Sequence, residues 1–118
     1  GFAKSFYNHY PQIKREYHTL ASVHTPEQLL GTIQSVELTS GLFGVNLFTQ
    51  LNYGNSRYTH KVYTDQPLLT KLLIEIDRNS TEQVYAPYKI GCGLAGGNWD
   101  KLYHDLETAN CNIIFYKI

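Results

Sequence analysis

The feature that most constrains the fold is a glycine-rich run between a strand-like and a helix-like segment. From Ile90 to Trp99 the chain reads Ile-Gly-Cys-Gly-Leu-Ala-Gly-Gly-Asn-Trp, with four glycines in the seven positions 91 to 97. Glycine lets the backbone approach a ligand closely and tolerates a positive φ angle. The helix that follows directs its unpaired N–H groups and positive dipole end back toward this run. The sequence therefore predicts an anion-binding loop, with phosphate as the usual anion.

The rest of the chain predicts an α/β fold. Apolar residues with period two indicate strands, and apolar residues three and four apart indicate helices. These patterns predict strands over 32–38, 43–49, within 82–90 and over 112–116, a loop over 52–64, a single helical turn at 25–28, and helices over 2–10, 12–21, from 65 to 79 and from 99 onward. The turn signal Ser40-Gly41 predicts a hairpin between the first two strands. Alternating strands and helices from Phe43 onward favour a mixed sheet, in which ligands bind at the carboxyl ends of strands.

Composition limits the classes of protein that this chain can represent. With 118 residues, 42% of them hydrophobic and ten of them tyrosine, it is long enough for one small folded domain. Ten basic residues balance ten acidic ones, which gives no electrostatic case for a nucleic-acid partner. No apolar run approaches the roughly 20 residues that span a bilayer, so we expect no membrane segment. The sequence leaves the oligomeric state open.

The two cysteines and five histidines predict neither a disulfide nor a metal site. Cys92 lies inside the glycine-rich run, where a disulfide with Cys111 would lock a segment that should admit a ligand. Reduced cysteines indicate a cytoplasmic protein. The histidines lack the spacing of zinc ligands, so no metal or other cofactor is expected.

The run 91–96 also matches the dinucleotide fingerprint G-x-G-x-x-G. That fingerprint requires an acidic residue about 20 positions later on a second strand, and the strand expected over 112–116 carries none. The run also lacks the Lys-Ser/Thr pair of a P-loop. The interpretation of the chain as a dinucleotide-dependent oxidoreductase therefore depends on this match alone. A second alternative is that the run is only a tight turn from strand to helix.

Three parts of the chain match one known family. They are, in chain order, Gly1 to Phe6 with Tyr10-Pro11, Leu47 to Gln50 with Tyr53-Gly54, and Ile90 to Trp99 with the ending Ile113 to Ile118. They resemble, respectively, the end of the first loop, the central strand with its exit loop, and the second phosphate loop with the C-terminus of macro domains. The chain is most similar to the short branch that contains terminal ADP-ribose protein glycohydrolase and the yeast-type ADP-ribose-1''-phosphate phosphatase, a form that phage and bacterial relatives share.

The resemblance implies a three-layer α/β/α domain with a mixed sheet. Residues 1–118 would form a single macro-like domain that is incomplete at its N-terminus, because the family pattern has a first strand and an Asn-containing first loop before the step that Gly1 begins. The implied ligand is ADP-ribose or an ADP-ribosylated substrate. The residues implied to bind it are Gly1, Phe2, Ala3, Thr49, Gln50, Ile90, Gly91, Cys92, Gly93, Leu94, Ala95, Gly96, Gly97, Tyr116 and Ile118.

The resemblance implies less about catalysis. The glycohydrolase branch has an acidic residue where this chain has Ala95 and a lysine where it has Gln50, so the pair expected to act on the distal ribose is missing. The phosphatase branch keeps a neutral loop like this one. His60 and Asp65 are the visible polar candidates near the site, and for His60 a solvated loop position is the favoured explanation. The catalytic residues stay unknown, and the alternatives are a hydrolase acting on ADP-ribose-1''-phosphate or ADP-ribosyl groups and a non-catalytic ADP-ribose reader.

Overall fold

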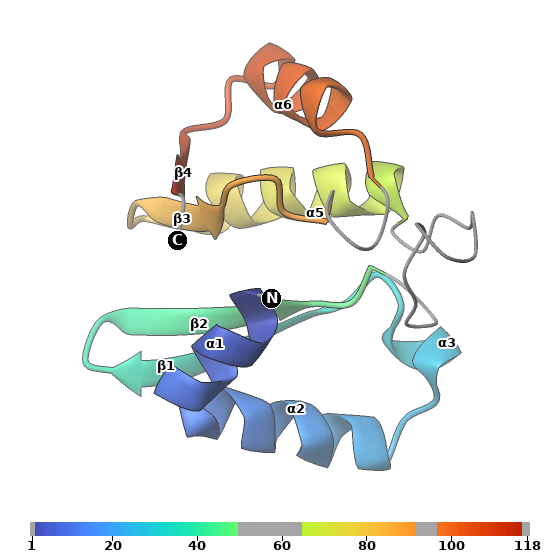
Figure 1. The fold of residues 1–118 in the computed structure, drawn as a ribbon, viewed down its shortest axis with the longest axis vertical. Coiled ribbons are helices and arrows are strands. Elements are labelled where there is room, and N and C mark those ends of the chain that lie inside the picture. Colours follow the sequence, from blue (N-terminus) through green and yellow to red (C-terminus); the bar gives the residue numbers. More distant parts are fainter. Residues whose placement is uncertain (1, 50–64, 92–96, 117–118) are drawn as a thin grey trace. The chain divides into compact units, whose positions relative to one another are not determined.

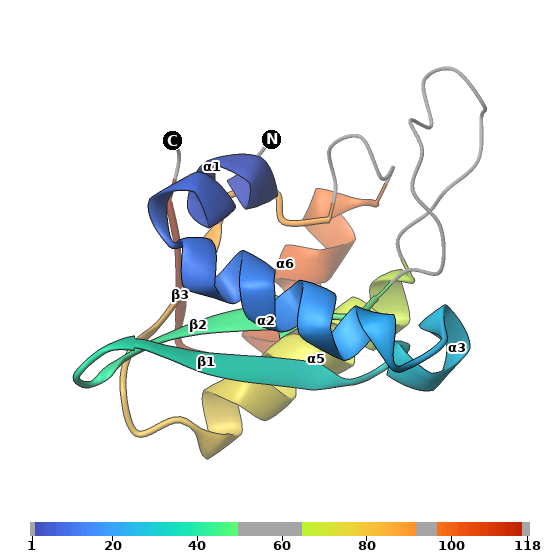
Figure 2. The same ribbon diagram turned by 90° about the horizontal axis from the view of Figure 1, so that it is seen from below.

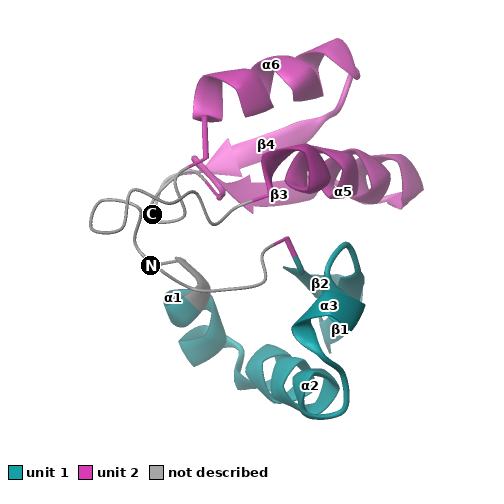
Figure 3. Ribbon diagram, turned by 90° about the vertical axis from the view of Figure 1, so that its right-hand side faces the viewer, with its two compact units in different colours: residues 1–48 teal, residues 49–118 magenta. Residues whose placement is uncertain are grey.

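The computed structural model describes residues 2–49, 65–91 and 97–116. The chain forms two compact units, residues 1–48 and 49–118 (Figure 3). The elements are, in chain order, α1 (Phe2–His9), α2 (Pro11–Ser22), α3 (Pro26–Leu29), β1 (Ile33–Thr39) and β2 (Leu42–Leu47) in the first unit, and α5 (Gln66–Asn79), β3 (Val84–Pro87), α6 (Trp99–Thr108) and β4 (Ile113–Tyr116) in the second (Figure 1). Both units combine helices with a short sheet, so the α/β class is confirmed.

The first unit is built on the predicted hairpin. Strand β1 pairs antiparallel with β2, beginning with Ile33 opposite Leu47, and its register is irregular between Glu37 and Thr39. Gly41 occupies the turn with a φ of 79°, a left-handed conformation that glycine adopts without the steric cost of a Cβ. The Ser40-Gly41 signal therefore identified the turn correctly.

Helix α2 supplies the core of the first unit. It begins at Pro11, whose fixed φ suits the first helical position. Its Ile13 is fully buried against the hairpin, where Gly44 provides the space for it. Figure 2 shows α2 lying along the hairpin, in agreement with its contacts to both strands. A short α3 follows, opened by a capping box between Thr25 and Gln28.

A chain of side-chain hydrogen bonds links four elements of the first unit. The Tyr7 hydroxyl of α1 donates to Oδ1 of Asn46 on β2 at 2.9 Å, and Nδ2 of Asn46 donates to Oε1 of Gln34 on β1 at 3.0 Å. The Gln34 amide then donates to the backbone oxygen of Glu16 on α2 at 3.0 Å. Partial burial, and to a lesser extent the nearby Tyr17, raise the pKa of Tyr7. Its phenol therefore keeps its proton and stays a donor at neutral pH.

The second unit is a strand–helix–strand crossover. Strands β3 and β4 pair in parallel, from Val84 opposite Ile113 to Pro87 opposite Tyr116, and α6 lies between them in the chain. Parallel strands require such a crossover connection, and they place their carboxyl ends at one edge. The glycine-rich run leaves β3 at that edge and leads into α6.

Helices α5 and α6 pack on each other and supply most of the core of this unit. Asp65 caps α5 by accepting a hydrogen bond from the Leu68 backbone N–H at 3.1 Å, and Pro67 occupies its first turn. The buried residues of the unit are Leu69, Leu72 and Leu73 of α5, Ala86 of β3, and Leu102 and Leu106 of α6. The buried leucines of α5 recur with helical spacing, so they lie on one face of the helix and contribute to this core.

The predicted helices and strands are confirmed wherever the structure describes them, with ends shifted by a residue or two. The loop predicted over 52–64 lies outside the described residues. The described strands pair in two separate two-stranded sheets, one antiparallel and one parallel. The α/β class is therefore shown, while the single mixed sheet of a three-layer architecture stays a prediction.

Candidate functional site

The candidate site lies at the carboxyl edge of β3 and β4. The Tyr88 N–H donates to the Tyr116 oxygen at 2.8 Å, which extends the parallel pairing by one step beyond the strands. The chain then turns, with Ile90 donating to Pro87 O at 3.1 Å. Lys89 and the first glycine of the run both have positive φ angles, 60° and 71°. A non-glycine residue with this conformation is uncommon, so the turn is a specific local structure.

The two ends of the glycine-rich run are bonded to each other. The Gly97 N–H donates to the Gly91 oxygen at 3.2 Å. Gly91 has a φ of 71°, where a side chain would be strained. The residues between them, 92–96, lie outside the described part of the chain. This bond fixes where the run leaves the sheet edge and where it returns.

The start of α6 is anchored by aromatic packing. The Trp99 ring lies 4.9 Å from that of Phe115 and 5.1 Å from that of Tyr88, centroid to centroid, in both cases edge to face. Tyr103, one turn along α6, lies 5.7 Å from Trp99. Edge-to-face pairs stabilise beyond their buried area. A hollow of about 380 Å³ is lined by Tyr88, Trp99, Tyr103, Ile113 and Phe115.

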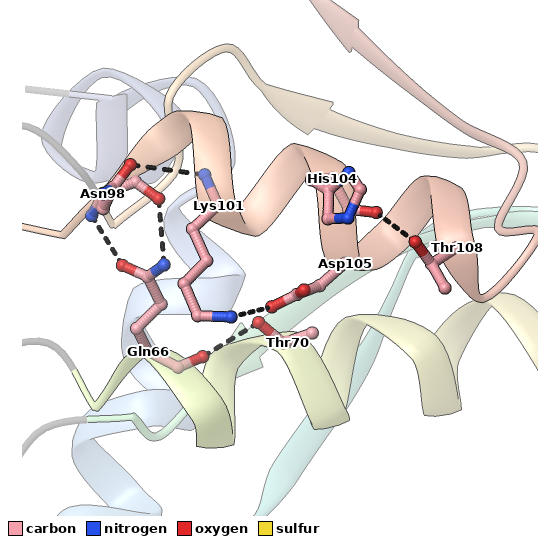
Figure 4. Close-up of polar contacts among 7 residues, drawn as sticks. All are labelled: Gln66, Thr70, Asn98, Lys101, His104, Asp105 and Thr108. Carbon is pink, nitrogen blue, oxygen red and sulfur yellow. Dashed lines mark hydrogen bonds and ion pairs between the residues drawn. The ribbon is translucent and has the colours of Figure 1, made fainter.

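The first residue of α5 also holds the start of α6. Figure 4 shows the Gln66 side chain facing the backbone of Asn98, with Nε2 donating to the Asn98 oxygen at 2.9 Å and Oε1 accepting from the Asn98 N–H at 2.5 Å. The Asn98 side chain caps α6 by accepting from the Lys101 N–H at 3.2 Å. A groove of about 480 Å³ between the helices is lined by Gln66, Pro67, Thr70, Ile74, Asn98, Lys101 and Asp105.

The start of α5 is bonded in turn to the end of the second predicted strand. The Asp65 N–H donates to the Thr49 oxygen at 2.9 Å. The Asp65 carboxylate accepts from Leu68 as a helix cap. Asp65 therefore acts in the structure as a capping residue. His60, the other polar candidate, lies outside the described residues.

Two further side chains of the second unit have shifted pKa values. The hydrogen bond and charge of Glu107, in that order, raise the pKa of the exposed Tyr103 phenol. Partial burial, then the negative charge of Asp77, raise the pKa of the Cys111 thiol. Cys111 is a free cysteine, and its raised pKa favours the unreactive thiol over the thiolate. Neither group has the lowered pKa of a nucleophile.

The structure brings several of the predicted ligand residues together. Ile90, Gly91 and Gly97 lie at the sheet edge, joined by the bonds described above, and Tyr116 reaches the same edge through its bond with Tyr88. Thr49 accepts a hydrogen bond from Asp65 at the start of α5. Phe2 and Ala3 begin α1 in the first unit. The remaining predicted residues, Gly1, Gln50, Cys92, Gly93, Leu94, Ala95, Gly96 and Ile118, lie outside the described residues.

The sequence reasoning missed Gln66. Asp65 and Pro67 mark the start of a helix, and between them Gln66 looks like an ordinary exposed residue of a first turn. Its partner Asn98 is 32 positions away, and no spacing rule connects a glutamine side chain with a distant main-chain pair. The nearest sequence signal is that both positions begin helices.

Within residues 2–49, 65–91 and 97–116, no three His, Cys, Asp or Glu side chains come together as metal ligands would. In the same residues no helix combines the length and the apolar character that crossing a bilayer requires.

Comparison with known proteins shows the fold alone. No family model matches the chain, and no curated protein matches it. One similar solved structure is the crystal structure of a protein from Bacteroides thetaiotaomicron, a structural genomics target. It matches with a TM-score of 0.68 over 99% of this chain and 77% of that chain, at 22% sequence identity. At this identity the likeness shows that the two chains share a fold.

Proposed function

We propose that the chain is an ADP-ribose-binding domain of the macro type, with the three-layer architecture and cytoplasmic location typical of that family. The resemblance of residues 90–99, together with the chain's opening and ending, is the reason for naming this ligand. The arrangement of the second unit supports the proposal, because it is the arrangement that phosphate-binding loops use.

The observation that carries the proposal is the position of the glycine-rich run. It leaves β3 at the shared carboxyl edge of two parallel strands and enters α6 directly. A ligand at this edge would meet both the glycine backbone and the positive end of the α6 dipole. Gly91, with its φ of 71°, begins the run in a conformation that suits glycine.

Three backbone N–H groups beside the glycine-rich run are already bonded within the protein. The N–H groups of Ile90, Gly97 and Asn98 already donate to Pro87, Gly91 and Gln66. The proposal therefore assigns no diphosphate oxygen to these three N–H groups. The Tyr116 ring, 37% exposed at the end of β4, would border the adenine.

The chemistry proposed at this site is hydrolysis of ADP-ribose-1''-phosphate or of ADP-ribosyl groups. The non-catalytic reader is the second candidate, and the observation that favours it is that Ala95 and Gln50 replace the acid and lysine of the glycohydrolase branch. Release of inorganic phosphate from ADP-ribose-1''-phosphate by the purified protein would exclude the reader. Absence of release, with ADP-ribose still bound, would exclude the phosphatase.

Isothermal titration calorimetry with ADP-ribose tests the binding itself. We expect saturable heat for the wild type and none for Gly93→Val, because a branched side chain would fill the space the diphosphate needs. Gly41→Ala, in the hairpin turn of the first unit, is the control and should bind as the wild type does. An absence of heat with wild-type protein at millimolar ligand would overturn the proposal. Equal affinity in Gly93→Val would show that the run is only a turn.

A further inference from the structure

We draw no further inference here: the strongest candidate, the aromatic hollow of about 380 Å³ in the second unit that is lined by Tyr88, Trp99, Tyr103, Ile113 and Phe115, is an apolar surface on α6 and β4, and nothing in the structure shows what covers it.

Discussion

The two units of the chain pair their strands in different ways. The first unit pairs neighbouring strands through a tight turn, and its helix α2 covers the hairpin. The second pairs strands that are almost 30 residues apart, with a helix and the glycine-rich run between them. Each unit has a small core with a fully buried side chain, which is Ile13 in the first unit and Leu102 in the second.

The difference shows why the candidate site belongs to the second unit. An antiparallel hairpin joins the end of one strand directly to the start of the next, so the two carboxyl ends lie at opposite edges. A parallel pair brings both carboxyl ends to one edge and sends its connection through a helix start. Only the second arrangement places glycine backbone, strand ends and a helix N-terminus together.

The largest expected effects test whether the two cores are equivalent. Leu102→Ala and Ile13→Ala each remove a fully buried side chain, one in each unit. Each should lower the free energy of unfolding by about 2–5 kcal/mol, measured by urea denaturation. A loss below about 1 kcal/mol in either variant would show that its side chain is not enclosed as the structure has it.

The next test is specific to the first unit. A Cβ at Gly44 would collide with Cδ1 of Ile13 and would lie 3.3 Å from Cδ1 of Leu38. Gly44→Ala should therefore lower the free energy of unfolding by about 1–3 kcal/mol. Adding Ile13→Val removes the colliding Cδ1 and should recover part of this loss. A double variant that is no more stable than Gly44→Ala would contradict the packing described.

A pair of glycines with similar backbone angles sharpens the comparison of function. Gly91 and Gly41 have φ values of 71° and 79°, one in each unit. Alanine at either position should cost about 1–2 kcal/mol of stability through backbone strain. Only Gly91→Ala should also weaken ADP-ribose binding in titration calorimetry. Equal loss of binding in both variants would mean that backbone strain anywhere in the chain weakens ADP-ribose binding, whatever the geometry of the glycine-rich run.

The smallest expected effects concern the helix caps. Asn98 caps α6 through its side chain, and Thr25 caps α3 in the first unit. Alanine at either position should cost about 1 kcal/mol in urea denaturation. Asn98→Ala keeps the main-chain groups that Gln66 holds, so its ADP-ribose affinity should stay close to that of Thr25→Ala. A much weaker affinity in Asn98→Ala would assign the Asn98 side chain a direct role at the site.

Local signals in the sequence accounted for most of the secondary structure. Pro11 and Pro67 mark helix starts, Ser40-Gly41 marks a turn, and the leucines of α5 recur with helical spacing. Each of these signals acts within a few residues, where steric limits on the backbone and apolar periodicity are decisive. The glycine-rich run was likewise recognised from its own composition and from the patterns on either side.

The sequence by itself thus determined the elements, their order and the place of a candidate anion loop, because those depend on neighbouring residues. Tertiary structure decided the rest. It paired β3 in parallel with β4, bonded Gly97 back to Gly91, and brought Gln66 to Asn98 across 32 positions. Such contacts follow from how packed elements meet in space, and hydrogen-bond partners chosen in that way leave no periodic trace along the chain.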